Sequence, residues 1–301
     1  MLINKKYTCN LLLLLIVLLL LANIAAADKI KPFGDPRAKK GGQITFLAND
    51  FPKSFNYYVN NASDAALVFG LIYETLAEVD PVTLEFVPLL AESWEISDDK
   101  MTFKIKMNKK ARWADGKPVT AEDLKFTYDV IMDPKNMTSV QRMGMSRFEE
   151  PKLLNQYEIQ FKAKFVHFNN LVQLLATQVL PKHLFAGKDF NKAFNMSLPP
   201  GSGPYVLAEV KEGRYYTLKR RQDYWGYSLP QHGGLFNFDK IKFKIITDEN
   251  VAFEAFKKGE FDVFVETTAK RWVNETNSKK FQMNWILKKK VYNHNPQGFQ
   301  G

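Results

Sequence analysis

The stretch Trp113-Ala-Asp-Gly-Lys-Pro118, followed by Thr120-Ala-Glu-Asp123, indicates how this chain turns from sheet to helix. An Asp-Gly pair is typical of a tight turn, and the proline after it delays any helix until a capping residue is reached. Thr120 and Asp123 have the spacing of a capping box, so a helix is predicted to begin there and to end at Asp133-Pro134. A turn that joins a strand to a capped helix is typical of a mixed α/β fold.

Alternating and periodic segments surround this turn. Met101 to Met107 alternates apolar and polar side chains, which predicts a half-exposed strand with Trp94 to Ser97 as its hairpin partner. A further strand is predicted at Tyr157 to Phe161 and a helix at Asn170 to Val179. The breaker Pro199-Pro-Gly-Ser-Gly-Pro204 then predicts a subdomain boundary.

Beyond the breaker, the sequence predicts a strand, a helix and a second strand in succession. The strands are Ile241 to Ile246 and Phe261 to Val265, and the helix between them, Glu249 to Lys258, is closed by Gly259. A glycine directly after a helix is a typical C-cap, and a unit of this kind implies parallel strands. Two strands before this unit are predicted to form a hairpin, Tyr205 to Val210 and Tyr215 to Arg220.

The chain before residue 80 predicts a first strand, a polar aromatic loop and a helix. The strand is Gln43 to Leu47, the loop is Asp50 to Asn61, and the helix runs from Asp64 to Glu78. Because the helix is apolar around most of its circumference, it is expected to be buried. The loop residues Tyr57 and Tyr58 either stack on a ligand or pack on the protein, and the sequence leaves both interpretations open.

The first 27 residues have the features of a cleavable secretory signal peptide. Lys5 and Lys6 precede an apolar run from Leu11 to Ala22, and cleavage is expected after Ala27. The run is shorter than the ~20 residues that a membrane span needs. Cys9, the only cysteine, precedes this run instead of following it, so no lipid anchor is predicted. A mature chain without cysteine suits a bacterial periplasm.

The composition favours a globular binding protein over an enzyme or a nucleic-acid reader. Hydrophobic residues make up 46% of the chain, which is enough to build a core. The metalloprotease, nucleophile-elbow, P-loop and dinucleotide-binding spacings do not occur, and the four histidines are far apart, so no catalytic residue, metal or cofactor is predicted. Despite a net charge of +10, basic residues are dispersed apart from Lys288-Lys-Lys290, so no nucleic-acid partner is expected.

Several blocks of the sequence together resemble extracellular solute-binding protein family 5, the peptide-binding proteins of bacterial ABC importers. They occur in the family's order and are Pro88-Leu-Leu-Ala-Glu-Ser-Trp94, Trp113-Ala-Asp-Gly-Lys-Pro118, Gly201-Ser-Gly-Pro-Tyr205, Tyr224-Trp225-Gly226 and Lys258-Gly-Glu-Phe-Asp262. The segments Ala269-Lys-Arg-Trp272, after Glu266, and Asn295-Pro-Gln-Gly298 are most similar to the YejA-like branch, whose members bind oligopeptides.

The resemblance implies an α/β fold of the type II periplasmic binding protein kind, in which a hinge joins two lobes. Residues 28–65 and 201–265 would form the core of lobe I, and residues 66–200 a subdomain inserted into it. Residues 266–301 would form the hinge and the start of lobe II. Since family members are considerably longer than this chain, most of lobe II is expected to be missing.

The ligand in this family is enclosed between the lobes and is bound through its backbone. The resemblance implies that the segment just before the first buried helix lines this cleft, and that residues near the hinge are the next candidates. The predicted ligand-binding residues are Asn61, Ala62, Ser63, Asp64, Glu266 and Trp272. The acidic residue that anchors the ligand's amino terminus in peptide-binding relatives comes from the missing portion, so none is predicted here.

The function that the resemblance implies is that of a monomeric periplasmic receptor, which delivers oligopeptides to the membrane permease of an ABC importer. The same scaffold also accepts oligosaccharides, metal chelates and haem, so the cargo stays open. A truncated, non-transporting extracytoplasmic interaction protein is the alternative, and it stays open as well. The two differ because a receptor needs both lobes.

Overall fold

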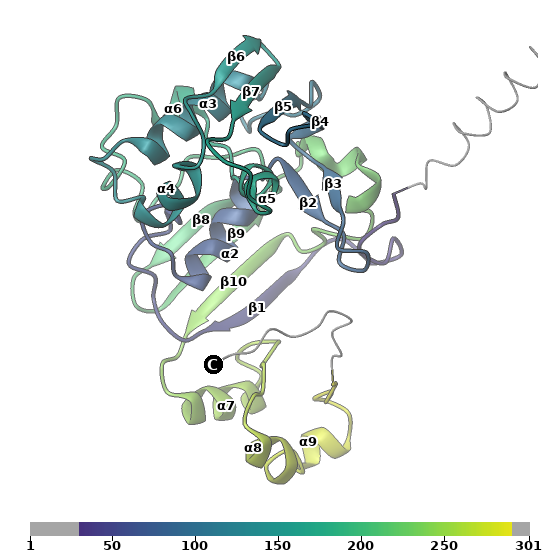
Figure 1. Ribbon diagram of the computed structural model, residues 1–301. Coiled ribbons are helices and arrows are strands. Elements are labelled where there is room, and N and C mark those ends of the chain that lie inside the picture. Colours follow the sequence, from purple (N-terminus) through teal and green to yellow (C-terminus); the bar gives the residue numbers. More distant parts are fainter. Residues whose placement is uncertain (1–29, 291–301) are drawn as a thin grey trace, which may run out of the picture.

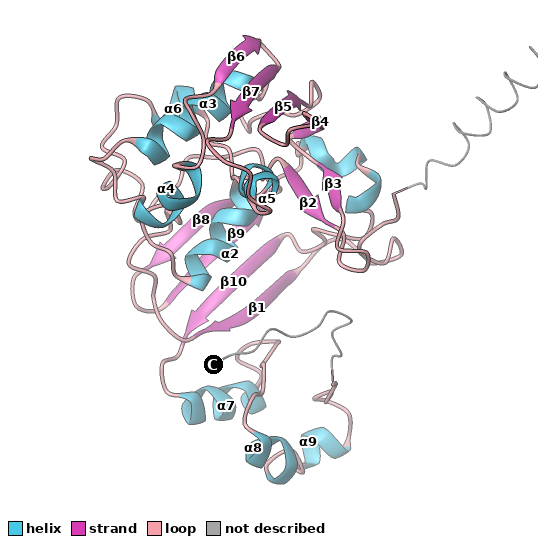
Figure 2. Cartoon of the chain, viewed as in Figure 1, coloured by secondary structure: helices cyan, strands magenta, loops and turns pink. Residues whose placement is uncertain are grey.

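The computed structural model describes residues 30–290, so the predicted signal peptide and the segment Asn295 to Gly298 lie outside the described residues (Figures 1 and 2). The first of two four-stranded sheets has the order β1-β10-β9-β8. In it β1 is parallel to β10, and the other neighbours are antiparallel. Its strands are β1 (Gln43–Ala48), β8 (Tyr205–Lys211), β9 (Tyr215–Arg220) and β10 (Lys240–Ile245).

The second sheet is antiparallel throughout and comes from the middle of the chain, in the order β4-β5-β7-β6. A short antiparallel pair, β2 with β3, precedes it. The strands are β2 (Ala77–Val79), β3 (Phe86–Pro88), β4 (Ala91–Ile96), β5 (Thr102–Met107), β6 (Lys152–Asn155) and β7 (Glu158–Lys162). The predicted hairpin of 94–97 with 101–107 and the strand at 157–161 are confirmed.

The helices divide into three groups. In Figure 1, α2 lies over the first sheet, α3 to α6 lie with the second sheet, and α7 to α9 lie on the far side of β1. They are α2 (Ser63–Ile72), α3 (Ala121–Met132), α4 (Ser139–Met145), α5 (Asn170–Leu175), α6 (Lys182–Phe185), α7 (Glu249–Lys258), α8 (Ala269–Asn274) and α9 (Lys279–Gln282). Two 3-10 helices, η1 (Trp225–Ser228) and η2 (Pro230–His232), follow β9.

One continuous apolar core joins the two sheets through α2. It includes Phe243 of β10, Phe69 of α2 and Ile105 of β5. The helix α2 contains residue 66, where the family resemblance places the start of the inserted subdomain, and it also packs against β8. A smaller core beneath α7 includes Ala252, and Leu47 of β1 packs against it. Phe46, the neighbour of Leu47, packs against the main core, so the two cores lie on opposite faces of β1, because neighbouring residues of a strand point to opposite faces.

The predicted turn from Trp113 to Thr120 is confirmed, and the Asp123 carboxylate holds it in place. The Asp123 carboxylate accepts hydrogen bonds from the Thr120 backbone N–H at 2.9 Å and from the Thr120 hydroxyl at 3.1 Å. The Trp113 indole N–H also donates to it, at 3.3 Å, and so does the backbone N–H of Lys182, at 3.0 Å. This one buried carboxylate therefore joins the turn, the start of α3 and the start of α6.

The helix predicted at 64–78 ends early, at Ile72, so the prediction is wrong for residues 73–78. Tyr73 is extended, and the Ile72 carbonyl accepts a hydrogen bond of 2.8 Å from the backbone N–H of Gly203. That glycine lies so close that a Cβ on it would be 2.5 Å from the Leu71 carbonyl oxygen. The distant Gly201 to Gly203 segment thus occupies the place where the helix would continue, which helical propensity does not reveal.

The end of the helix predicted at 170–179 is also wrong, because α5 ends at Leu175. The backbone N–H of Val179 donates to the carbonyl of Glu74 at 3.0 Å, and Gln178 forms an antiparallel bridge with Thr75. The residues after Leu175 therefore pair with the segment that leaves α2. Both helices therefore end where segments distant in sequence bond to the chain, which are Gly201 to Gly203 for α2 and Glu74 to Thr75 for α5.

The unit predicted at 241–265 is confirmed in its first two elements. Gly259 caps α7 in the left-handed conformation, with φ of 82°. The expected second strand is wrong, since Val263 makes only a single parallel bridge to Phe46. Asp262 instead makes two hydrogen bonds to the backbone of Thr45. The Asp262 carboxylate accepts from the Thr45 N–H at 2.7 Å, and the Asp262 N–H donates to the Thr45 carbonyl at 2.8 Å. The predicted hairpin of β8 and β9 is confirmed.

Candidate functional site

The start of α2 carries the first four predicted site residues. Ala62 is the N-cap, with φ of −69° and ψ of 145°, and no side chain caps the first turn. Asn61, Ala62 and Ser63 are exposed, and Asp64 is half-buried. The first backbone N–H groups of a helix have no partner within it, so this open end can donate hydrogen bonds to carbonyl groups of a bound chain.

A residue that the sequence argument missed, Gln141, contacts this segment. Its side-chain amide donates a hydrogen bond of 2.6 Å to the Asn61 side-chain oxygen. Its own amide oxygen is buried and has no hydrogen-bond partner among residues 30–290. Gln141 lies on α4, where Val140 and Met143 are exposed. The helix that reaches Asn61 therefore carries exposed apolar side chains as well as Gln141, and no local motif on this short helix indicates the contact.

The electrostatics of the α2 end are acidic. Burial, and then the negative charge of Asp50, raise the pKa of the Asp64 carboxyl. The Tyr216 ring is fully buried and stacks on Phe243, with ring centres 4.9 Å apart. Burial, and then the charge of Asp64, raise the pKa of the Tyr216 hydroxyl, so it stays protonated. A half-buried carboxylate of this kind can accept hydrogen bonds from amide or ammonium groups.

The Glu266 carboxylate already has protein partners. Arg271 Nη1 lies 3.1 Å and 3.3 Å from its two oxygens, and the Thr268 backbone N–H donates to it at 2.6 Å. Arg271 also reaches α7 through Glu249, at 2.9 Å, and Asn250, at 3.2 Å. In the part of the chain that is described, Arg271 therefore joins the segment after residue 265 to α7, and Glu266 holds Arg271 from within that segment. The role of Glu266 towards a ligand stays a prediction.

Trp272 lies at a large open cavity beside α8. The cavity measures about 750 Å³, and Glu266 also lines it. The Lys288 ammonium lies over the Trp272 ring, 4.3 Å from its centre, and donates to the Thr276 hydroxyl at 2.7 Å. Much of the remaining lining is aromatic or aliphatic, including Phe253 and Phe256. An apolar hollow with a cation over an indole can accept an apolar or acidic side chain.

The two groups of predicted residues are separate in this structure. Asn61 to Asp64 begin α2, on one face of the first sheet, whereas Glu266 and Trp272 belong with α7 and α8 on the other side of β1 (Figure 1). Between residues 30 and 290, no hydrogen bond joins the two groups, and none of residues 61–64 lines the cavity of about 750 Å³ beside Trp272. Their place in a common cleft stays a prediction.

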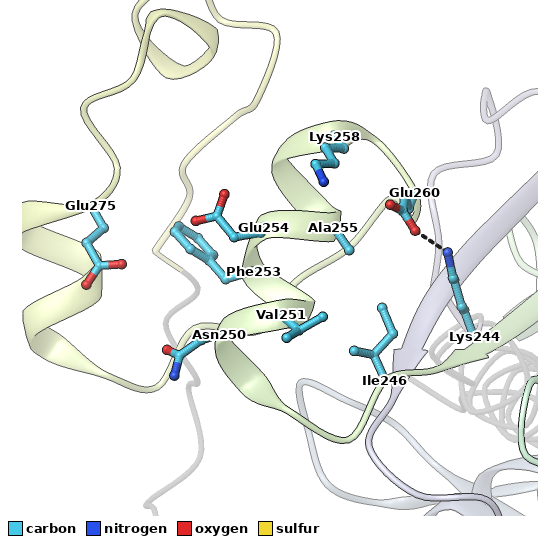
Figure 3. A pocket seen from close by; sticks show the side chains of 10 residues that line it. All are labelled: Lys244, Ile246, Asn250, Val251, Phe253, Glu254, Ala255, Lys258, Glu260 and Glu275. Atoms are coloured by element: carbon cyan, nitrogen blue, oxygen red, sulfur yellow. Dashed lines mark hydrogen bonds and ion pairs between the residues drawn. The ribbon is translucent and has the colours of Figure 1, made fainter.

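A second, smaller hollow lies between α7 and the end of β10. It measures about 490 Å³, and Figure 3 shows Val251 and Ala255 of α7 on the side of the helix that faces Ile246. Lys244 pairs with Glu260 at its rim. None of the predicted site residues lines this hollow.

Residues 30–290 hold no cluster of three or more histidine, cysteine, aspartate or glutamate side chains that could bind a metal ion. Among the same residues, no helix has the length and apolar character needed to cross a membrane.

The arrangement of the sheets, with helices on both faces of β1, defines a lobe of the type II periplasmic binding protein fold. AppA of Bacillus subtilis, an oligopeptide-binding protein solved in complex with a nonapeptide, has this fold and superposes with a TM-score of 0.71. The two are 25% identical, over 81% of this chain and 47% of AppA. The dipeptide-binding protein from Pseudoalteromonas sp. SM9913 shares the fold at a TM-score of 0.67, with 19% identity over 79% of this chain and 50% of that one.

Residues 85–299 match the family described as "Bacterial extracellular solute-binding proteins, family 5 Middle", and the chain belongs to this family. The protein named YejA in Escherichia coli strain K12 is 32% identical over 87% of this chain and 43% of its own length. A probable peptide-binding protein YejA of Agrobacterium fabrum is 30% identical over 79% of this chain and 39% of its length. The predicted family, its YejA-like branch and the fold class are confirmed. The chain spans less than half the length of these relatives.

Proposed function

We propose that this chain is the lobe I part of a receptor that binds oligopeptides outside the cytoplasm. The observation that carries the proposal is the open start of α2, where Asn61 is held by Gln141 and the backbone N–H groups of the first turn are free of side-chain caps. AppA, which shares the fold, was solved with a nonapeptide, and one Agrobacterium relative is named a probable peptide-binding protein.

Backbone groups would do most of the recognition. An extended peptide offers the same carbonyl and amide groups whatever its sequence, so a wall of backbone donors accepts many peptides. The half-buried Asp64 would accept from ligand amide groups, and the apolar side chains of Val140 and Met143 would lie beside ligand side chains. Glu266 and Trp272 would contact the ligand from the hinge.

Membership of the family supports a proposal for the partners and the location. We place the receptor in the periplasm, after removal of residues 1–27, as a monomer that delivers its ligand to the permease of an ABC importer. Residues 66–200 would form the inserted subdomain, and residues 266–301 the hinge and the start of lobe II.

A second candidate cargo is a fragment of peptidoglycan. One relative, from Agrobacterium fabrum, is named the peptidoglycan-binding protein YepA and is 30% identical over 81% of this chain. Such fragments contain a peptide that the same backbone donors could bind, and a sugar that would need further contacts. This candidate differs from the first in requiring the sugar part for affinity.

The test is an NMR titration of the 301-residue chain with millimolar peptides of unrelated sequence, with a peptidoglycan disaccharide peptide as the comparison. We expect the amide signals of residues 61–64 and of Gln141 to shift with several peptides, at dissociation constants near millimolar. Shifts only with the disaccharide peptide would favour the second candidate. Shifts confined to other surfaces would refute the site.

A further inference from the structure

A buried group of titratable side chains lies where η2 packs against β2, away from the proposed ligand site. His232 of η2 has a fully buried side chain, and Glu78 of β2 faces it. Glu74, between α2 and β2, and Tyr224, just before η1, complete the group. Nothing in the proposed function uses these four residues.

The contacts of His232 require a proton on each ring nitrogen. Its Nδ1 lies 2.8 Å from the Gly226 carbonyl oxygen, which can only accept, so Nδ1 donates. Its Nε2 lies 3.0 Å from both oxygens of Glu78. An ionised carboxylate also only accepts, so a neutral imidazole with its proton on Nδ1 would place a lone pair against it. A further proton must lie between His232 and Glu78 for this contact to be favourable.

Glu74 adds a second carboxyl to the group, and unlike the half-buried Glu78 it is buried. Its oxygens accept from the Tyr224 hydroxyl and from the Trp225 indole N–H, the latter at 2.8 Å. Burial raises the pKa of Glu74 to about 7, although these hydrogen bonds act in the opposite direction. Burial and the charge of Glu74 raise the pKa of Tyr224 well above its ordinary value, so its hydroxyl remains a donor.

Arg221, another charged residue near Tyr224, has partners of its own. It donates to the carbonyls of Gly201, Ser202 and Gly203, and it pairs with Asp223 at 3.2 Å. Burial opposes the charged form of His232, but the hydrogen bond and charge of Glu78 outweigh it, so the pKa of His232 is raised. The positive charge beside Glu78 and Glu74 is therefore the imidazolium of His232.

This group joins parts of the chain that are far apart in sequence. Glu74 and Glu78 lead from α2 into the β2–β3 pair, whereas Tyr224 and His232 belong to the segment after β9. A neighbouring contact, from the Gln231 side-chain amide to the Pro88 carbonyl at 3.0 Å, joins the same segments without a titratable group. The junction therefore combines contacts to titratable groups, at Glu74 and Glu78, with a contact that depends on no proton, at Pro88.

We propose that Glu74, Glu78, Tyr224 and His232 form a proton-dependent latch, which fastens the η1–η2 segment to β2 in neutral and mildly acidic solution and loosens as the pH rises. The folded chain holds a proton that the unfolded chain releases near the ordinary pKa values of histidine and glutamate. Stability is therefore fully present below those values and is lost as the pH rises through the raised values in the folded state. For each such proton, the unfolding equilibrium constant rises up to about tenfold per pH unit within that window.

The experiment compares the pH dependence of thermal unfolding in the 301-residue chain and its Glu78→Gln variant, with Glu95→Gln as the control on exposed β4. A glutamine amide can donate to a neutral His232, so the variant needs no shared proton. We expect the melting temperature of the parent and of the control to fall between pH 6 and 8.5, and the fall in Glu78→Gln to be less than half as large. Equal falls in all three would overturn the latch.

A second measurement does not depend on any variant being stable. The His232 ring signals, identified by their loss in His232→Gln, are followed by NMR in the parent chain from pH 5 to 9, together with amide exchange corrected for its intrinsic rate. The latch predicts a midpoint above the ordinary ~6.5 of histidine, and faster exchange in residues 225–232 than in β9 once that midpoint is passed. A midpoint at or below the ordinary value would refute it.

Discussion

The side-chain amide of Gln141 donates a 2.6 Å hydrogen bond to Asn61 and so joins α4 to the start of α2. These residues are 80 positions apart in sequence, and the bond lies at the surface. It places an element from the middle of the chain at the segment that the family resemblance assigns to the ligand cleft. The start of α2 therefore depends on α4 for its position.

Replacing Gln141 by alanine should loosen this segment without unfolding the protein. One exposed hydrogen bond is worth about 1 kcal/mol at most, so the melting temperature should change little. NMR order parameters of the backbone N–H groups of Ala62 to Asp64 should fall, because Asn61 loses its partner. They should not change in Gln156→Ala, an exposed glutamine elsewhere. Unchanged order parameters in Gln141→Ala would show that the bond does not hold the segment.

Replacing Asp123 by alanine should destabilise the fold strongly. The variant leaves the buried indole N–H of Trp113 and the partly buried donors of Thr120 and Lys182 without their acceptor, and the expected loss in the free energy of unfolding is about 2–4 kcal/mol. Glu122→Ala, one position earlier, removes only an exposed ion pair with Lys182 and should cost less than about 0.5 kcal/mol. Urea denaturation of both variants measures the difference, and similar losses would contradict the role given to Asp123.

Two glycines near the end of α2 should respond oppositely to alanine. A Cβ at Gly201 would lie 2.1 Å from the Ile72 carbonyl oxygen, so the backbone must move, at a cost of about 2–4 kcal/mol. At Gly70, inside α2, the nearest atom would be 3.4 Å away at the Gln178 amide, and helix propensity favours alanine by up to about 1 kcal/mol. Equal melting temperatures of the two variants would refute this account of why α2 ends at Ile72.

A charge reversal on the first sheet should stabilise it slightly. Lys240 and Lys219 are direct cross-strand partners, and like charges in this position repel. Lys240→Glu should raise the free energy of unfolding by about 0.5 kcal/mol, and the neutral Lys240→Gln by less. The gain should shrink in 1 M salt because the charges are screened. A gain that does not depend on salt would show that the effect is not electrostatic.

The elements whose signals are local could be predicted from the sequence, as Thr120, Asp123 and Gly259 illustrate. Caps and turns act through neighbouring residues, so their spacing identifies them. The end of α2 could not be predicted, because Gly203 and Val179 arrive from other parts of the chain to pair with the residues involved. The sequence does not decide whether Tyr57 and Tyr58 bind a ligand or pack on the protein. In the structure Tyr58 is buried, and its ring lies edge-on to Phe69.

In the candidate site too, the sequence does not reveal the contacts between distant segments. The sequence pointed to Asn61 through the family resemblance, but Gln141 carries no motif and its contact depends on how α4 packs. The pairing of Glu266 with Arg271 was equally hidden, since a carboxylate near a hinge looks the same in sequence whether it faces a ligand or a guanidinium. Contacts between distant segments are the part that sequence patterns do not show.

The central claim is that this chain supplies one wall of a peptide cleft that a second lobe must close. A ligand held by one lobe keeps much of its backbone in water, and losing about 4 kcal/mol weakens a micromolar site to roughly millimolar. The direct measurement is a paired calorimetric titration, with one peptide pool, of residues 28–301 and of the same residues completed with the remaining C-terminal part of the Escherichia coli relative, after both show a single cooperative unfolding transition. The account predicts micromolar binding by the completed protein and weak or undetectable binding by the chain alone. Equal micromolar binding by both, or no peptide binding by the completed protein, would contradict it.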